Sequence, residues 1–405
     1  MKKIIAILVC VVMAAALFTA CAAETPAETS APAEESASAE ASAPAEESAE
    51  ASEPAASGEA KTIGYYKDAA DDYYKAGYEV FLECLKADPE TANWEVIDKV
   101  GQGTAQEQLA AVEDFITTGV DAIVVVQNSP EITAECITKA NEAGIPYFAL
   151  THAPTVPAGG ELAGFIGYDF VETGVMAGED ALQYNNGEGV KKLVMVEGKL
   201  GQGTASAQSL GFLQAYEEAG KDIGGTANDV AVNKTAGGAD LEIVQWSSGD
   251  WMADPAKKVV ADVITALGAD GFDGMYVQND EMMDGAIQAI EEAGLNPADY
   301  WLGSSNGKEK SWTWAEEGRV TMDVNQTPAL EGDALYQMLK AYFNGEEYRQ
   351  YIAPYLTPYN SSNVTELTLV PYVVADYMAG REAGDYVTDI NDPKFTDATE
   401  LITFN

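Results

Sequence analysis

The sequence has very few of the residues that bind metal ions or activate nucleophiles. It contains one histidine, His152, and four cysteines among 405 residues. A zinc site built from several histidines is therefore impossible, and no cysteine spacing matches a metal-binding cluster. A single histidine without a recognisable partner makes no catalytic triad. We expect no metal and no cofactor.

Two of the cysteines, Cys84 and Cys136, lie in helix-like segments of the main part of the chain. A disulfide between them stays open as an alternative, but we expect two buried free thiols. The other two, Cys10 and Cys21, belong to the N-terminal leader.

Basic residues are also scarce. The chain has 22 Lys and Arg residues against 66 Asp and Glu residues, so its formal net charge is −44. Contact with phosphates requires a basic face, and we therefore expect no nucleic-acid partner. An acidic surface mainly keeps an exported protein soluble, although it could also favour a cationic ligand.

The N-terminus has the pattern of an export signal. Residues 1–21 carry two lysines, then a short apolar run, then small residues before Cys21. The run is too short for a membrane span, so we interpret it as a signal peptide. The stretch LFTAC at 17–21 resembles the lipobox of bacterial lipoproteins, with Phe18 where leucine is usual. The resemblance implies cleavage before Cys21 and a lipid on its sulfur; an ordinary signal peptide with an incidental cysteine is the alternative.

Residues 22–60 contain only Ala, Glu, Ser, Pro, Thr and one Gly, with ten glutamates and no basic residue. Such a segment has nothing apolar to bury and repels itself, which predicts a disordered, extended tether. Together with the leader, it predicts an exported protein. It would be lipid-anchored to the outer face of the bacterial cytoplasmic membrane or lie in the periplasm.

From Lys61 onward, short strands rich in Val and Ile alternate with amphipathic helices. Continuous apolar strands are typical of parallel sheets that helices cover on both faces, so the pattern predicts a run of βαβ units. We expect strands at 62–66, 94–100, 121–126, 145–150, 164–169, 191–198, 241–246, 272–280, 300–307 and 319–326. We expect helices at 73–87, 106–119, 130–144, 171–183, 206–220, 255–268 and 282–294.

The alternation restarts near residues 165–169, which indicates an α/β protein of two Rossmann-like lobes with parallel sheets. We expect the first lobe to hold 61–168 with about 327–360, and the second lobe to hold 169–326 with about 361–405. Ligands of open parallel sheets bind outside the carboxyl ends of the strands. Two such lobes would place those ends on either side of a shared cleft.

Several stretches resemble the type I periplasmic solute-binding proteins, in particular their ribose-binding-like branch. The most specific is VQNDEMMDGAIQAIEEAG at 277–294, which is similar to that family's strand–turn–helix motif. The stretches at 63–77, 120–131, 142–150 and 324–332 follow in the family's order. The resemblance covers most of 61–365. It implies two lobes joined by a three-crossover hinge that close over a small ligand, a monomer, and delivery to an ABC permease without any chemical change.

The resemblance also implies aromatic residues that cover a sugar ring. Trp251 matches the family's stacking aromatic, and packing within its own lobe is the alternative. Tyr73 and Tyr74 follow the first strand; the register of the pair is uncertain by one residue, so both are candidates. Aromatic rings exclude water from the apolar faces of a sugar.

Polar candidates complete the expected site. Asp71 precedes the tyrosines, Asn279 should hydrogen-bond the ligand, and Asp280 either does so or caps the following helix. Gln326 matches a ligand-contacting glutamine, with a hinge hydrogen bond as the alternative. Asp169 is expected to cap a helix at the first crossover.

The charged groups with which ribose-binding relatives hold a pentose are missing. Thr151 and His152 replace an Asp-Arg pair, Gln208 replaces an arginine, and the run Ser304 to Gly307, with Asn306 facing the cleft, replaces an aspartate turn. Ribose is therefore doubtful. Another sugar, a polyol, a nucleoside or a different polar solute stays open. We expect His152 to act as a hydrogen-bonding cleft residue rather than as a base.

The string GQGTA occurs at 101–105 and again at 201–205. Neither copy has the lysine spacing of a phosphate-binding loop or the longer glycine fingerprint. We interpret both as tight turns whose threonine caps the next helix. The first copy should be structural, although Gln102 could reach the cleft rim, and the second should line the cleft.

Three functions remain as hypotheses. The first, which we prefer, is a lipid-anchored receptor for an ABC importer that binds a small polar solute, above all a sugar. The second is a surface glycosidase, for which abundant Asp and Glu are almost worthless as a signal. The third is a sensory receptor of the same fold for a signal molecule or nucleoside.

Overall fold

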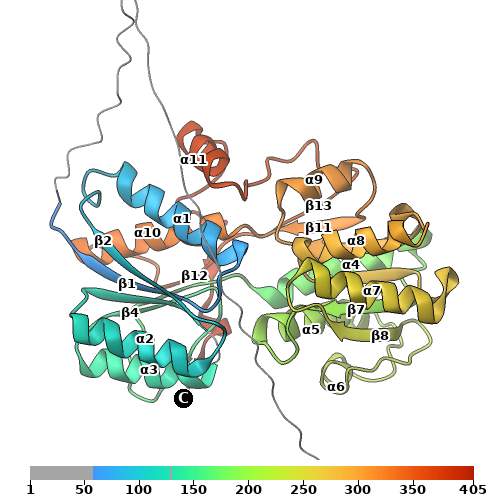
Figure 1. Cartoon of the computed structure of the whole chain (residues 1–405), viewed down its shortest axis with the longest axis horizontal. Helices are drawn as coiled ribbons and strands as arrows, with labels where there is room; N and C mark the ends of the chain where they lie inside the picture. The colour runs from blue at the N-terminus through green and yellow to red at the C-terminus, as the bar shows by residue number, and fades with distance from the viewer. Residues whose placement is uncertain (1–57, 128–129) are drawn as a thin grey trace, which may run out of the picture. The chain divides into compact units, whose positions relative to one another are not determined.

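The computed structural model describes residues 58–127 and 130–405. The expected signal peptide, the expected lipidation site at Cys21 and all but the last residues of the expected tether lie outside the described residues. From Thr62 onward, the chain folds into two lobes, each built on its own sheet (Figure 1). In the described part of the chain, no helix has the length and apolar character that a membrane crossing requires.

The first lobe has a seven-stranded sheet that is parallel except at one edge. Helices pack on both faces: Phe81 and Leu335 belong to the apolar cluster on one face, and Phe115 and Ile137 to the cluster on the other. The strands, in sheet order, are β14 (Thr396–Asp397), β12 (Tyr351–Ala353), β6 (Gly164–Ile166), β4 (Tyr147–Leu150), β3 (Ala122–Val126), β1 (Thr62–Lys67) and β2 (Glu95–Val100). The helices are α1 (Asp72–Ala87) and α10 (Pro328–Asn344) on one face, and α2 (Ala105–Thr118) and α3 (Pro130–Glu142) on the other.

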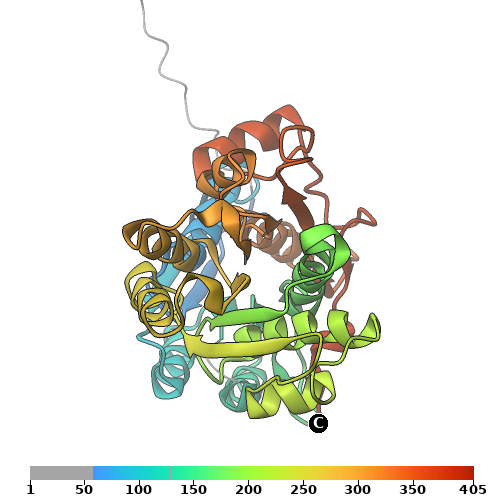
Figure 2. The same cartoon turned by 90° about the vertical axis from the view of Figure 1, so that its right-hand side faces the viewer.

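The second lobe repeats this plan, as Figure 2 shows end-on. Val260 and Ile287 pack on one face of its sheet, and Ala177 and Phe212 on the other. The strands, in sheet order, are β13 (Thr357–Asn360), β11 (Met322–Asn325), β10 (Trp301–Ser305), β9 (Gly274–Val277), β7 (Lys192–Glu197) and β8 (Glu242–Ser248). The helices are α7 (Ala253–Leu267) and α8 (Asp280–Glu292) on one face, and α4 (Phe170–Gly187) and α5 (Gly203–Glu218) on the other; short α6 (Ala227–Asn233) and α9 (Glu309–Glu316) add to this lobe.

Both sheets have the same doubly wound strand order. The first lobe runs β2-β1-β3-β4-β6, and the second runs β8-β7-β9-β10-β11. In each lobe the order reverses at the first strand of the lobe, and ligands of such sheets bind outside the carboxyl ends of the strands at this point. The fold therefore marks the turns after β1, β7 and β9 as the places to look for a site.

Local signals explain where several helices begin and end. Asp169 caps α4, as predicted, by accepting hydrogen bonds from the backbone of Val171 and Glu172. Gly119 ends α2 with a φ of 75°, a left-handed backbone conformation that glycine adopts at little cost. Thr104 of the first GQGTA copy caps α2 as expected, but Thr204 of the second copy does not cap α5. There Gln202 holds the capping position and makes no side-chain capping bond.

The end of the chain differs from the prediction. The second lobe was expected to hold about 361–405, yet α11 (Val374–Ala383) packs on the first lobe. In the first lobe, β14 also pairs with β12, and β15 (Thr403–Phe404) pairs with β5 (Thr155–Val156). β13, expected in the first lobe, pairs with β11 of the second. The chain therefore crosses between lobes near 167–169, 326–327 and 354–356, and returns to the first lobe near Val370.

A buried ion pair explains this return. Asp333 of α10 is fully buried and accepts hydrogen bonds from Arg381 Nε at 2.5 Å and from the Tyr377 hydroxyl at 2.8 Å, both on α11. A buried carboxylate needs such partners, because removing it from water without them is costly. The contact ties α11 to α10 of the first lobe.

Cys84 and Cys136 are both buried free thiols, as predicted. They lie in the apolar clusters on opposite faces of the first sheet. Burial raises the pKa of Cys136 to about 11, which keeps this thiol protonated at neutral pH.

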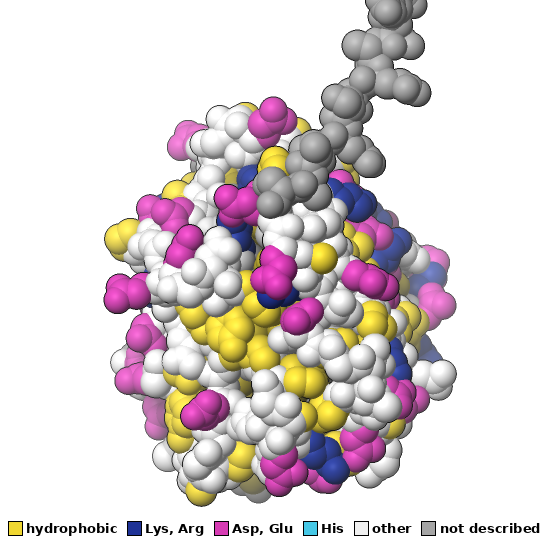
Figure 3. Space-filling model, turned by 90° about the vertical axis from the view of Figure 1, so that its left-hand side faces the viewer, with side chains coloured by type: hydrophobic (Ala, Val, Ile, Leu, Met, Phe, Trp, Pro, Cys, Tyr) yellow, Lys and Arg dark blue, Asp and Glu magenta, His cyan; other side chains and the backbone are white. Residues whose placement is uncertain are grey.

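Acidic side chains are spread over the face of the first lobe that Figure 3 shows, and fewer basic ones lie among them. This matches the excess of carboxylates in the composition. Within the described residues, no group of three or more His, Cys, Asp and Glu side chains has the geometry to hold a metal ion.

The close crossing of α4 and α5 gives a test of the fold. A Cβ on Gly211 would lie 1.9 Å from the Val171 carbonyl oxygen, whereas a Cβ on Gly203 of the same helix would meet no atom within 4 Å. We expect Gly211→Ala to lower the free energy of unfolding by about 1–3 kcal/mol through overpacking. Thermal unfolding measures this, with Gly203→Ala as the matched control. Equal melting temperatures for the two variants would show that the helices do not cross this closely.

Candidate functional site

A cavity of about 490 Å³ lies between the two lobes. Its walls come from the turn after β1, from the end of β4 and from the loops after β7, β8, β9, β10 and β11. These are the carboxyl ends of the parallel strands, as the strand order predicts. Residues predicted from the sequence that line it are Asp71, Tyr73, Tyr74, Thr151, His152, Gln208, Trp251, Asn279, Asn306 and Gln326. Asp280 does not line it.

The first turn of α1 brings three of these residues to the cavity. Asp71 caps the helix by accepting a hydrogen bond from the Tyr74 backbone N–H at 2.8 Å. The rings of Tyr73 and Tyr74 lie at an interplanar angle of 89°. Both tyrosines line the cavity, so both candidates of the pair are placed at the site. Tyr74 Oη lies 2.8 Å from Nε2 of His152, which fixes the Tyr74 side chain.

His152 is enclosed by protein, and the loss of hydration lowers its pKa to about 4. It is therefore neutral at pH 7 and offers hydrogen bonds without charge. Its backbone carbonyl also accepts a hydrogen bond from Gln127 Nε2. This fits the expected role of a hydrogen-bonding cleft residue.

Thr151 has a φ of 65°, which is unusual for a β-branched residue. Its Oγ1 donates to Glu331 of α10 at 3.1 Å, and its backbone N–H donates to the Ile166 carbonyl at 2.7 Å. Glu331 is 2% exposed, and burial raises its pKa to about 8 although Thr151 and Tyr73 oppose the shift. Glu331 thus holds the side chain of the cavity residue Thr151, and sequence analysis missed Glu331.

Trp251 lies at the tip of the turn after β8 and has a φ of 62°. Its ring packs so closely on Gly198 that a Cβ there would lie 2.2 Å from the indole. Its Nε1 donates to Gln202 Oε1 at 2.5 Å, and its backbone carbonyl accepts from Asn279 Nδ2 at 3.3 Å. The indole is therefore held in place before any ligand arrives.

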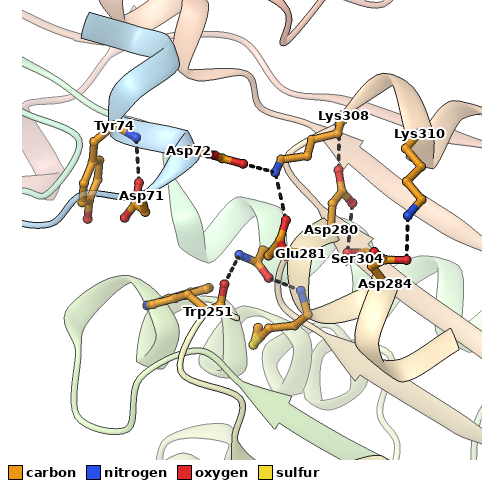
Figure 4. A network of polar contacts seen from close by, with 12 residues as sticks. Asp71, Asp72, Tyr74, Trp251, Asp280, Glu281, Asp284, Ser304, Lys308 and Lys310 are labelled. Carbon is orange, nitrogen blue, oxygen red and sulfur yellow. Dashed lines mark hydrogen bonds and ion pairs between the residues drawn. The ribbon is translucent and has the colours of Figure 1, made fainter. Parts of the chain in front are cut away.

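The predicted roles of Asn279 and Asp280 need a correction. Asn279 caps α8 by accepting from the Met282 N–H at 2.9 Å, and it also lines the cavity. Asp280 turns away from the cavity and accepts from the backbone N–H of Lys308 at 2.7 Å and from Ser304 Oγ at 3.2 Å (Figure 4). Asp280 therefore fixes the turn that carries Asn306 and Lys308, and is neither the cap nor a cavity residue.

Three amide side chains form the second lobe's polar wall. Gln208 Oε1 accepts from the Tyr276 hydroxyl at 3.0 Å. Gln326 Oε1 accepts from Thr173 Oγ1 at 2.7 Å, and Gln326 Nε2 donates to Asn306 Oδ1 at 3.3 Å. Gln326 therefore lines the cavity and makes a hinge hydrogen bond at once, so the two roles considered for it are compatible.

Lys308 links the lobes at the cavity. Its Nζ lies 3.5 Å from Asp72 of the first lobe and 3.2 Å from Glu281 of the second (Figure 4). It also lies 5.1 Å from the centroid of the Tyr372 ring. Sequence analysis missed Lys308 and Tyr372, and also Phe170, which begins α4 beside the predicted cap Asp169.

The two GQGTA copies have different surroundings, as predicted. Gln202 and Thr204 of the second copy line the cavity, and Gln202 holds the Trp251 indole. In the first copy, Thr104 and the Gln102 backbone N–H both bond Glu107 in the first turn of α2. Gln102 is not among the cavity residues, so the first copy is a packing turn.

A larger cavity of about 660 Å³ lies within the second lobe, between α4, α5 and β13. Met322, which lines it, begins β11, so this cavity is at the amino ends of the strands. The first lobe contributes none of the residues that are described as lining it. We therefore take the cavity between the lobes as the candidate site.

Comparison with known proteins shows the family and the fold. A family model described as periplasmic binding protein domain matches residues 66–347. The galactofuranose-binding protein YtfQ of Escherichia coli strain K12 is 27% identical over 236 residues, which are 58% of this chain and 68% of that protein. A putative rhizopine-binding protein of Rhizobium meliloti is 26% identical over 230 residues, 56% of this chain and 67% of that protein.

Solved structures show the same fold. A galactofuranose-binding protein superposes with a TM-score of 0.64 at 22% identity, covering 80% of this chain and 100% of that one. A solute-binding protein of Bacillus halodurans, solved with myo-inositol, has a TM-score of 0.63 at 21% identity, covering 76% of this chain and 96% of that one. At such identities the likeness is one of fold.

The buried carboxyl of Glu331 predicts a pH dependence of stability. Its pKa in the folded protein, about 8, lies above the ordinary 4.5, so between these values the folded protein binds more protons than the unfolded chain. Its contribution to the free energy of unfolding therefore falls as pH rises, by up to about 1.4 kcal/mol per pH unit. Glu331→Gln removes this titration. The melting temperature of the variant minus that of the wild type should therefore increase as pH is raised from 5 to 8.

The control for this experiment is Glu316→Gln, at an exposed position of α9. Its melting temperature should differ from the wild type by the same small amount at every pH. A difference between Glu331→Gln and the wild type that is constant with pH would contradict a protonated Glu331 in the folded state.

Proposed function

The chain belongs to the periplasmic binding protein domain family, and on that premise we propose that it binds a sugar or sugar-like polyol in the cavity between its lobes and delivers it to an ABC importer. The observation that carries the proposal is the composition of the cavity wall. Aromatic rings from both lobes, above all Tyr73, Tyr74 and Trp251, stand among amides and carboxylates. That mixture suits a ligand with apolar ring faces and hydroxyls around its edge.

The arrangement of the cavity supports a closing motion around the ligand. Each lobe has its own core, and chain segments join the lobes near 167–169, 326–327, 354–356 and Val370. Phe170, Gln326 and Tyr372, at or next to three of these segments, line the cavity. A ligand held by Tyr74 of one lobe and Trp251 of the other would stabilise the state in which the lobes are close together. Hinge closure of this kind buries most of a small ligand.

The relatives support a carbohydrate. YtfQ is named for galactofuranose, and other similar proteins are named for xylitol in Mycolicibacterium smegmatis and for fructose in Bifidobacterium longum. The missing charged clamps at Thr151, His152 and Gln208 make ribose the least favoured of the sugars. The proposed export, lipid anchor at Cys21 and partner permease follow from the leader sequence and the family.

A sensory receptor of the same fold remains the second candidate, because ligand binding between lobes serves transport and signalling equally well. A glycosidase is disfavoured: the family is one of binding proteins, and of the lining carboxylates Asp71 caps a helix while Asp72 and Glu281 pair with Lys308. A receptor saturates at one ligand per chain and releases the ligand unchanged. Nuclear magnetic resonance of the recovered ligand separates a receptor from an enzyme.

Trp251 provides the sharpest test of the site. A thermal-shift screen of pentoses, hexoses, polyols, nucleosides and amino acids first supplies a ligand. For this ligand, Trp251→Ala should weaken binding at least tenfold, about 1.4 kcal/mol, because the stacking surface is lost. The melting temperature without ligand should change little, since the indole is only partly buried.

Two variants serve as controls in isothermal titration calorimetry. Trp251→Phe keeps an aromatic face and should retain most of the affinity. Trp94→Ala removes a tryptophan of the first lobe that packs on Phe343, away from the cavity, and should leave affinity unchanged. Unaltered affinity in Trp251→Ala would remove Trp251 from the site, and failure of every carbohydrate in the screen would overturn the sugar proposal.

A further inference from the structure

The cavity has an imbalance of charge. Four carboxylates line it, those of Asp71, Asp72, Asp254 and Glu281, and Lys308 is the one Lys or Arg among the described lining residues. Lys308 is already balanced, because its Nζ lies near both Asp72 and Glu281. His152 adds no charge at neutral pH. Asp71 and Asp254 therefore keep negative charge that the protein does not offset.

Asp71 is an exposed carboxylate of the cavity wall. One oxygen, Oδ1, accepts from the Tyr74 N–H as the helix cap. Among the described residues, no Lys or Arg forms an ion pair with Asp71. Figure 4 shows its side chain on the cavity side of the first turn of α1. The second oxygen is available to a ligand.

The surroundings of Asp71 make its charge costly in the empty cavity. Asp71 is exposed as a residue, but the protein around its carboxylate removes part of the hydration of that group. This loss of hydration, with repulsion from Asp72 and Asp68, raises its pKa to about 6 although the backbone of Tyr74 and Tyr73 opposes the shift. A cation beside Asp71 would relieve both the lost hydration and the repulsion.

Aromatic rings near Asp71 suit a cation as well as a sugar face. Tyr73, Tyr74, Trp251, Tyr372 and Phe170 all line the cavity. The negative face of an aromatic ring attracts an ammonium group within about 6 Å. One such contact already exists, since Lys308 Nζ lies 5.1 Å from the Tyr372 ring centroid.

We propose that the solute is a polyol that carries an amine, such as an amino sugar, with its ammonium group on Asp71 and its hydroxyls on the amides of Gln208, Asn279 and Gln326. The inference rests on the proposed function and narrows its ligand class. A neutral sugar would also hydrogen-bond Asp71 but would leave its charge uncompensated. A sugar acid or sugar phosphate would meet four carboxylates and only the paired Lys308.

Matched pairs of ligands test the proposal. Isothermal titration calorimetry at pH 7 compares D-glucosamine with D-glucose, D-galactosamine with D-galactose and D-mannosamine with D-mannose on the wild-type protein. The N-acetyl derivatives of D-glucosamine, D-galactosamine and D-mannosamine add a neutral form of each amine. We expect at least one amine to bind ten or more times more tightly than both its parent sugar and its acetylated form.

Two variants assign this preference to its residue. Asp71→Asn keeps a good helix-capping side chain, so the variant should fold with a melting temperature close to the wild type. It should reduce the ratio of amine affinity to parent-sugar affinity to about threefold or less, because the amide cannot offset an ammonium charge. Glu316→Gln removes an exposed carboxylate of α9 that is not among the cavity residues, and it should keep the preference.

The outcomes separate this inference from the proposed function. Parent sugars that bind as tightly as the amines, or more tightly, would overturn the amine while leaving sugar binding in place. An amine preference that survives in Asp71→Asn would overturn the role of Asp71. Absence of binding by all six sugars and amino sugars would overturn the amine and also count against the sugar-binding proposal.

Discussion

The structure depends on one constraint: two parallel sheets must present their carboxyl ends to the same cavity. Each doubly wound sheet has a point where strand order reverses, and helices on both faces leave that end of the sheet uncovered. Because the chain passes between the lobes beside these ends, the turns after β1, β7 and β9 meet across about 490 Å³. Neither lobe alone would enclose a ligand.

The cavity walls are held by the same interactions that begin and end the helices. Asp71 and Asn279 each cap a helix and line the cavity, so the helix cap fixes each of these side chains at the cavity wall. Trp251 is held by Gly198 and Gln202, and Thr151 by buried Glu331. Positions prepared in this way lower the entropy that ligand binding would otherwise cost. Asp71 takes part in such a helix cap, yet no Lys or Arg among the described residues forms an ion pair with its carboxylate.

Strand and helix periodicity predicted both lobes, whereas the resemblance to a known family, above all at 277–294, supplied the predicted residues that line the cavity. The errors arise where periodicity gives no information. Asn279 and Asp280 are neighbours at the start of α8. Asn279 caps the helix, whereas Asp280 accepts a hydrogen bond from the Lys308 N–H, a contact that periodicity cannot predict. Glu331 reaches Thr151 across 180 residues, and β14 and β15 have two residues each, too few to show alternation.

The central claim is that a solute binds between the lobes, between the aromatic residues of α1 and Trp251. A crystal structure of the protein with a ligand that stabilises it in the thermal-shift screen tests this most directly. We predict ligand density in contact with Tyr73 or Tyr74 on one side and with Trp251 and Asn279 on the other. Density in the cavity beside Asp180 in the second lobe, with the space between the lobes filled only by water, would contradict it.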